Sequence, residues 1–256
     1  MALDVVRTSF NRHVATIKLN RPSSGNAVDE SLAFALTDAV NEVSQNDDVR
    51  VVVLTGEGPN FCLGTETPEG SGQAISPEAL GLFRVASSVA SLGKPVIAAI
   101  NGDAMDQGLE LALACDIRVA SEGSHFGLTQ VRSGLTPWDG GTQRLPRLVG
   151  RGVALEMIMT SRTVDAEEAL GIGLVNRLAK ADEVLESARD VARTIAAHGP
   201  IAAGYLKEAV LKAMDMTLEQ GLRLEADLNL LLQTTTDRAE GIQSFLQRRG
   251  PDYSGR

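Results

Sequence analysis

Residues 94–116, KPVIAAINGDAMDQGLELALACD, carry the clearest structural pattern of the sequence. It opens with a continuous apolar run, residues 95–100, which ends at Asn101-Gly102. A short apolar run bounded by turn residues is typical of a strand that is buried on both faces. The apolar residues 108–114 follow and predict a short helix. A strand, a loop and a helix in this order indicate one unit of an α/β fold with parallel strands.

The same pattern recurs on both sides of this stretch. Residues 51–55 (VVVLT) and 117–120 predict two more buried strands, and residues 77–92 predict a helix before the central strand. Nearer the start, residues 5–10 and 14–19 predict two strands of a hairpin that turns at Asn11-Arg12. Asp29 is expected to cap the helix that follows it. We therefore expect an α/β core whose central strands are parallel.

The chain becomes helical after Gly150. The expected helices cover residues 154–159, 166–170, 183–197, 205–214, 218–233 and 237–249. We expect a core domain over residues 1–197 and a helical C-terminal region over residues 198–256. Five leucines in this region are more than one thin helix can hide, namely Leu222, Leu228, Leu230, Leu231 and Leu232. A subunit interface would cover them, and packing on the core would do so equally well.

Composition excludes several classes of function. The 256 residues carry a formal net charge of −9, which disfavours a nucleic-acid partner but leaves room for a phosphorylated small ligand. No apolar run approaches the ~20 residues that span a bilayer, so we expect no membrane segment, and we expect a cytoplasmic location. The cysteines, Cys62 and Cys115, form no CxxC pair and the three histidines are scattered. We expect two reduced, buried thiols and no metal site.

Three segments in register resemble a known family. They are FCLGTE at residues 61–66, the opening stretch at 94–116, and residues 126–150, which end in GGTQRLPRLVG. Together with NRP at 20–22, they resemble the crotonase superfamily, the enoyl-CoA hydratase/isomerase family, over nearly the whole chain. The resemblance implies an α/β spiral of ββα units with a helical C-terminal trimerisation region. It also implies an acyl-CoA substrate, no cofactor beyond the coenzyme A of that substrate, and a homotrimer or hexamer.

The resemblance implies an oxyanion hole made by main-chain amides. The N–H groups of Thr65 and Gln107 would bind the thioester oxygen, and such donors are typically worth ~3–4 kcal/mol each. Asp106-Gln107 stands where the family usually has Gly-Gly. We expect Asp106 to cap the following helix, and the alternative is that its side chain enters the pocket.

By the same resemblance, this sequence has one of the two catalytic glutamates of the hydratases and lacks the other. Glu110 stands at the first position and could take a proton from water or from a carbon beside the carbonyl. The second position holds Gln130, which can hold a water molecule but cannot usefully transfer a proton. Asp139 lies within a residue of an aspartate in dienoyl-CoA isomerases and the dehalogenase branch. It could be the partner acid or base to Glu110, or form an Asx-turn.

Substrate contacts follow from the resemblance as well. Coenzyme A would meet the main chain of Asn26, Ala27, Leu63, Gly64 and Gly108, and Arg21, Arg248 or Arg249 would meet its phosphates. Trp138 would line the acyl pocket or belong to the core, and Phe245 would close the pocket from the last helix of its own or a neighbouring subunit. We expect an enoyl-CoA hydratase/dehydratase first. The alternatives are an isomerase, C–C hydrolase or decarboxylase of acyl-CoA, and a non-catalytic acyl-CoA binder.

Overall fold

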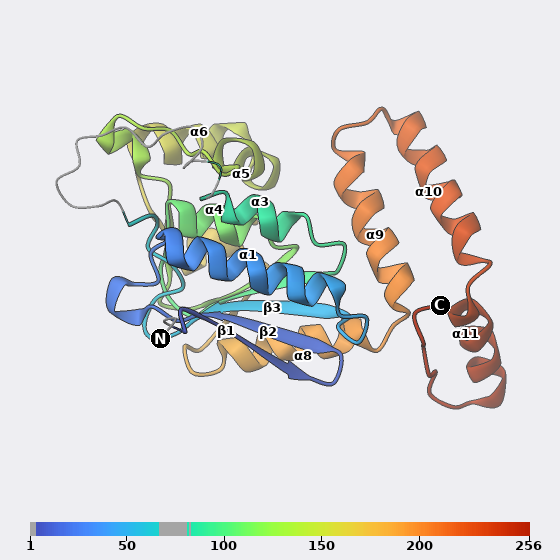
Figure 1. Ribbon diagram of the computed structural model, residues 1–256. Helices are drawn as coiled ribbons and strands as arrows, with labels where there is room; N and C mark the ends of the chain where they lie inside the picture. The colour runs from blue at the N-terminus through green and yellow to red at the C-terminus, as the bar shows by residue number, and fades with distance from the viewer. Residues whose placement is uncertain (1–3, 67–80, 82) are drawn as a thin grey trace.

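A six-stranded sheet forms the centre of the molecule (Figure 1). The computed structural model describes residues 4–66, 81 and 83–256. The strands lie in the order β1 (Val6–Asn11), β2 (Val14–Leu19), β3 (Val51–Gly56), β4 (Val96–Ile100), β6 (Ile117–Ser121) and β9 (Arg177–Ala179). β1 and β2 form the predicted antiparallel hairpin, and each later strand pairs in parallel with its neighbour. The predicted parallel α/β core is confirmed.

The central strands are buried on both faces, as their apolar runs predict. Every residue of β3 and of β4 is buried. On one face Val52 and Leu54 pack with α1 (Glu30–Gln45), and on the other Val51 and Val53 pack with α8 (Val184–Ala196). This alternation is the two-residue period of a strand. Asp29 caps α1 as predicted, because its Oδ1 accepts from the N–H of Leu32 at 2.8 Å.

Shorter elements complete the core. A second sheet contains β5 (Ala104–Met105), β7 (His125–Gly127) and β8 (Val164–Asp165). The helices are α3 (Val85–Ala90), α4 (Gln107–Leu113), α5 (Gly141–Val149), α6 (Arg151–Thr160) and α7 (Ala166–Gly171). The helix expected over residues 77–92 lies partly outside the described residues, and α3 is the part that the structure describes. The strands β5, β7, β8 and β9 and helix α5 were not predicted.

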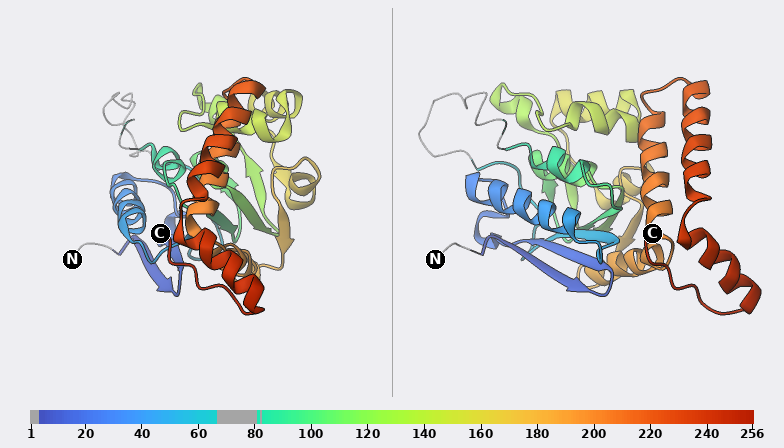
Figure 2. Two further views of the ribbon diagram at one scale, coloured as in Figure 1. Left: turned by 90° about the vertical axis from the view of Figure 1, so that its right-hand side faces the viewer. Right: turned by 45° about the vertical axis from the view of Figure 1, so that its right-hand side comes forward.

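Three C-terminal helices stand to one side of the core. α9 (Pro200–Ala213), α10 (Leu218–Leu232) and α11 (Thr236–Gln247), orange to red in Figure 2, confirm the predicted helices. Leu222, Leu230 and Leu231 are 56%, 68% and 52% exposed, so the core of the same chain does not cover them. The division of the chain at residue 197 stays a prediction. In the described part of the chain, no helix combines the length and apolar character needed to cross a bilayer.

Candidate active site

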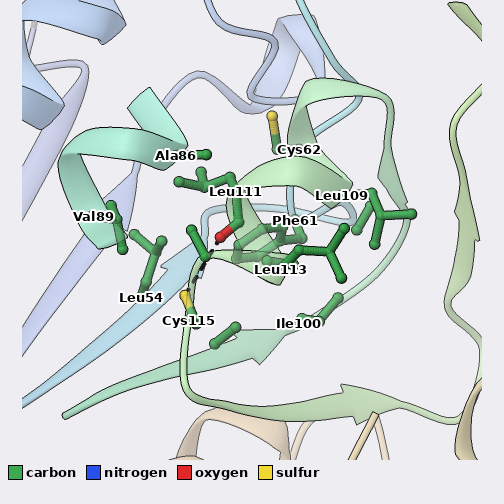
Figure 3. Packing of buried hydrophobic residues seen from close by; sticks show 14 of the residues in the cluster. Leu54, Phe61, Cys62, Ala86, Val89, Ile100, Leu109, Leu111, Leu113 and Cys115 are labelled. Carbon is green, nitrogen blue, oxygen red and sulfur yellow. Dashed lines mark hydrogen bonds between the residues drawn. The ribbon is translucent and has the colours of Figure 1, made fainter. Parts of the chain in front are cut away.

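Helix α4 anchors the candidate site in the core. All seven of its residues are buried. Leu109 and Leu113 pack near Phe61 and Ile100 (Figure 3). An ideal Cβ at Gly108 would lie 2.0 Å from the carbonyl oxygen of Cys62. Gly108 thus lets α4 lie against the loop 61–66, which is a packing reason for the glycine besides its predicted role at the substrate.

Glu110 is a fully buried carboxylate on α4. Its Oε1 accepts from the N–H groups of Asp139 and Gly141, both at 2.8 Å. Its Oε2 is buried and has no hydrogen-bond partner among the described residues. Burial raises the pKa of Glu110 to about 7, although the hydrogen bonds from Gly141 and Asp139 act in the opposite direction. One oxygen is therefore fixed and the other can bind a ligand.

Gln130 contributes a second set of polar atoms without partners. It begins the short 3-10 helix η2 (Gln130–Ser133) and is 8% exposed. Neither its Nε2 nor its Oε1 bonds to any described residue, and the same holds for the Nε1 of Trp138. An ideal Cβ at Gly141 would lie 2.9 Å from Leu128 and 3.1 Å from Glu110 Oε1, which brings the segment before Gln130 to the same corner as Glu110. Buried polar atoms rarely lack partners, so these atoms have capacity for water or substrate.

Asp139 uses its carboxylate to cap α3. Its Oδ2 accepts from the N–H of Ala86 at 2.6 Å, and its Oδ1 accepts from the N–H and the hydroxyl of Ser87 at 3.0 and 2.8 Å. Burial raises the pKa of Asp139, and the bonds from Ser87 and Ala86 oppose this rise. The alternative of an Asx-turn is not what the carboxylate makes, because it bonds to α3. Its catalytic role stays a prediction, with both oxygens engaged at α3.

The two proposed oxyanion donors lie on different segments, Thr65 on the loop 61–66 and Gln107 at the start of α4. Val28 donates to the carbonyl of Gly64 and accepts from the N–H of Glu66, at 2.7 and 2.9 Å. In such a parallel bridge the N–H of Thr65 points to the opposite side. Gln107 is the first residue of α4, where an N–H has no intrahelical partner. Neither N–H has a main-chain acceptor within the ranges that the structure describes.

The side chains of these two residues bond to each other. The hydroxyl of Thr65 donates to Oε1 of Gln107 at 2.6 Å, and Nε2 of Gln107 donates to the carbonyl of Phe83. Gln107 is fully buried. This chain of bonds could not be predicted from the sequence, because it joins three separate segments.

Asp106 does not cap α4, so that expectation is wrong. Its carboxylate instead accepts from the N–H and the hydroxyl of Thr129, the residue before Gln130. Its φ of 49° lies in the left-handed region that glycine adopts most easily. The backbone conformation expected of a glycine is thus kept by an aspartate that is tied to Thr129.

The residues that were predicted to contact coenzyme A differ in how far they are already bonded within the chain. The Asn26 side chain is buried and bonds to the main chain of Arg21, Glu57 and Asn60, so it braces two loops. Leu63 is 40% exposed. Gly64 has a φ of 109°, and an ideal Cβ at this position would lie 3.2 Å from the Cβ of Asp106. Ala27 accepts from Arg21 through its carbonyl oxygen. The roles of these residues at the substrate stay predictions.

The distal Phe245 and the arginines that were predicted to meet the phosphates have other surroundings within one chain, and their roles at the substrate stay predictions. Arg21 pairs with Glu66 and Asp29, at 2.6 and 3.1 Å, and Arg249 pairs with Glu240. Phe245 is 82% exposed, and its helix α11 lies away from α4 (Figure 1). A single chain therefore does not bring Phe245 to the acyl pocket.

Several residues of the site could not be assigned from the sequence. The N–H of Gly141 holds Glu110, and the only signal for it was the Gly140-Gly141 pair in the family-like segment. Phe83, Ser87 and Thr129 each accept or donate a bond that fixes a site residue, and nothing in the sequence marked them.

The two cysteines take no part in the chemistry that this arrangement allows. Both are free and buried, as expected, and burial raises the pKa of each thiol to about 12. Within residues 4–66, 81 and 83–256, no three His, Cys, Asp or Glu side chains are grouped as metal ligands.

Comparison with known proteins shows which family the chain resembles. Residues 9–256 match the family model described as enoyl-CoA hydratase/isomerase. The chain is 35% identical to the 2,3-dehydroadipyl-CoA hydratase of Escherichia coli, with 97% of this chain and 98% of that protein covered. It is also 35% identical to the short-chain-enoyl-CoA hydratase of Clostridium acetobutylicum, with 97% of each covered.

The solved structures agree as well. An enoyl-CoA hydratase from Bacillus anthracis superposes with a TM-score of 0.95 at 38% identity, with 99% of this chain and 100% of that chain covered. The family match covers nearly the whole chain, and the fold is that of a crotonase. The chain therefore belongs to the enoyl-CoA hydratase/isomerase family.

Proposed function

We propose that this chain is an enoyl-CoA hydratase, which adds water across the C2–C3 double bond of a 2-enoyl-CoA. The observation that carries the proposal is the buried carboxylate of Glu110, with Oε1 held by two main-chain amides and Oε2 without a partner among the residues that the structure describes. Relatives whose names state that they hydrate CoA esters support it.

The main-chain donors would stabilise the charge that forms during addition. The thioester oxygen would accept from the N–H groups of Thr65 and Gln107. When oxygen attacks C3, the electron pair of the double bond moves toward that thioester oxygen and an enolate forms. Donors that are already aimed at this oxygen stabilise the enolate more than the substrate, which lowers the barrier.

Glu110 would act as both base and acid. Its free Oε2 takes a proton from water while the remaining hydroxide forms the C–O bond at C3. The protonated Glu110 then returns that proton to C2 of the enolate, so the sum of the two steps is the addition of one water. A pKa near 7 allows both transfers at neutral pH. Gln130 would orient the water with its unpartnered amide.

The assembly and setting of the enzyme are part of this proposal. The exposed leucines of α10 support a homotrimer or hexamer in which these side chains are covered. The reaction uses no cofactor beyond the coenzyme A of the substrate. A cytoplasmic location is the setting that we expect from the composition.

The test is hydration of crotonyl-CoA and 2,3-dehydroadipyl-CoA. The reaction is measured as the loss of the absorbance of the conjugated thioester. We expect turnover by the wild-type chain and a loss of kcat of about 10³-fold in Glu110→Gln, because the variant cannot transfer the proton. Glu167→Gln on the exposed face of α7 is the matched control and should keep full activity.

Three outcomes would contradict the proposal. Full activity of Glu110→Gln would remove the assigned base. Solvent deuterium entering C2 without hydration would favour an isomerase or another enolate reaction. Binding of acyl-CoA without turnover would favour the non-catalytic alternative.

A further inference from the structure

We propose that Gln107 is a positioning residue whose side chain braces the oxyanion hole, through its hydrogen bonds to the Thr65 hydroxyl and to the carbonyl of Phe83. The inference rests on the proposed function only in that it assumes an enolate bound at the main-chain N–H groups of Thr65 and Gln107. It assigns to the two side chains the task of holding the two N–H donors at a fixed separation.

Thr65 is held from two sides. On one side, Val28 bonds to the main chain of its neighbours, Gly64 and Glu66. On the other side, the hydroxyl of Thr65 donates to Oε1 of Gln107 at 2.6 Å. The second bond is the one that links Thr65 directly to α4, the helix that carries the other donor and Glu110.

The Gln107 amide is bonded at both ends. Oε1 accepts from Thr65, Nε2 donates to Phe83, and the residue is fully buried. A side chain with both ends bonded in a packed interior keeps one rotamer, and neighbouring bonds of this kind hold reacting groups in place. The distance between the donor N–H groups is therefore fixed by a side-chain contact between the donor residues themselves.

The backbone on the other side of Gln107 is also fixed. Asp106 has a φ of 49° and its carboxylate is tied to Thr129. The direction of the Gln107 N–H is thus set by Asp106 before it and by the Gln107 side chain after it. Because the Thr65 hydroxyl donates its hydrogen bond to Gln107, it would act on the thioester oxygen only through the geometry of the N–H groups.

The first experiment removes the hydroxyl of Thr65 and then restores it. We expect Thr65→Val to lower kcat about 3- to 10-fold, the size of one neutral hydrogen bond, with KM changed less than about twofold. Thr65→Ser should recover kcat to within about twofold of the wild type. Thr37→Val is the matched control, because Thr37 is a half-buried threonine on α1 whose hydroxyl bonds to Ala33. An unchanged kcat in Thr65→Val, or an equal loss in Thr37→Val, would overturn the proposal.

A double-mutant cycle tests whether the two side chains act through the same bond. Gln107→Met keeps the length of the side chain and removes both hydrogen bonds. We expect the variant with both Thr65→Val and Gln107→Met to have a kcat within about twofold of Gln107→Met alone, because the shared bond is already lost. Losses that multiply would show independent roles and overturn the proposal.

A titration of bound acetoacetyl-CoA separates this inference from the hydratase proposal. The enolate of this ligand absorbs in the near ultraviolet, and an oxyanion hole makes the ligand ionise at lower pH than in water. We expect Thr65→Val to raise the pKa of the bound ligand by about 0.5–1, the equivalent of a 3- to 10-fold effect. If the wild type binds the enolate but hydrates no enoyl-CoA, the hydratase proposal fails and this titration still decides the role of Gln107. If the wild type does not lower the pKa of the ligand, there is no such hole to brace and the inference fails.

Discussion

The donor side and the carboxylate side of the site differ in how their side-chain polar atoms are bonded. On the donor side, Thr65, Gln107 and Asp106 all have partners within the chain. On the carboxylate side, Glu110 Oε2 and both polar atoms of Gln130 have none among the described residues. In the proposed reaction, the bonded side would keep its geometry while charge develops on the substrate. The open side would keep capacity to bind water and to transfer a proton.

The pH dependence is the strongest test of the open side. Because burial raises the pKa of Glu110 to about 7, the carboxylate that accepts the proton from water is lost as pH falls below 7. We expect kcat/KM to be about 100-fold lower at pH 5 than at pH 8, since about one site in 100 is ionised two pH units below the pKa. Hydration rates across this range measure it. A flat profile would show that Glu110 is not the base.

The variant Asp139→Asn tests whether Asp139 has a structural role, as on the bonded side, or a catalytic role, as on the open side. An asparagine has one side-chain oxygen and cannot accept from both Ala86 and Ser87 as the carboxylate does, so we expect the free energy of unfolding to fall by about 1–3 kcal/mol. We expect kcat to fall by about 10-fold at most, with the acidic limb near pH 7 retained.

Denaturant unfolding and a pH profile of the same variant give both quantities. Ser87→Ala, which removes only the hydroxyl that bonds to Asp139, is the control and should show a smaller loss of stability. A fall in kcat as large as that of Glu110→Gln, with a changed pH profile, would instead make Asp139 the partner acid or base.

An effect on stability alone is expected at Glu110 itself. Its pKa in the folded chain is about 7, above the ordinary 4.5, so the folded state binds the proton more tightly than the unfolded state. The wild type therefore loses stability as pH rises from about 4.5 to about 7. Glu110→Gln, which has no charge to bury, should be more stable than the wild type by about 1–3 kcal/mol at pH 8 and equal to it below about pH 4.5. Urea unfolding at the two pH values checks this. Equal stability of the two proteins at pH 8 would contradict the conclusion that burial destabilises the charged form of Glu110.

The sequence could predict elements whose pattern is local. The strands β3 and β4 are continuous apolar runs because both of their faces are buried, and α10 has a clear helical period. The strands β5 and β8 have two residues each, which is too short for any period to show.

The candidate site could be predicted only in part. The positions of Glu110 and the main-chain donors came from a resemblance to known segments. The bonds from Thr65 to Gln107 and from Asp139 to Ala86 join residues that are 42 and 53 positions apart, and no local pattern encodes them. The expected cap at Asp106 was wrong because its left-handed backbone turns the carboxylate toward Thr129.

The two hydrogen bonds to one oxygen of Glu110 have a stereochemical consequence. Because Asp139 and Gly141 hold Oε1, the proposed mechanism would pass both the proton taken from water and the proton given to C2 through Oε2. A single atom reaches only one side of a flat enoyl group. In that mechanism the new hydroxyl at C3 and the new hydrogen at C2 would arrive on the same face, so the addition would be syn and the product would have one handedness.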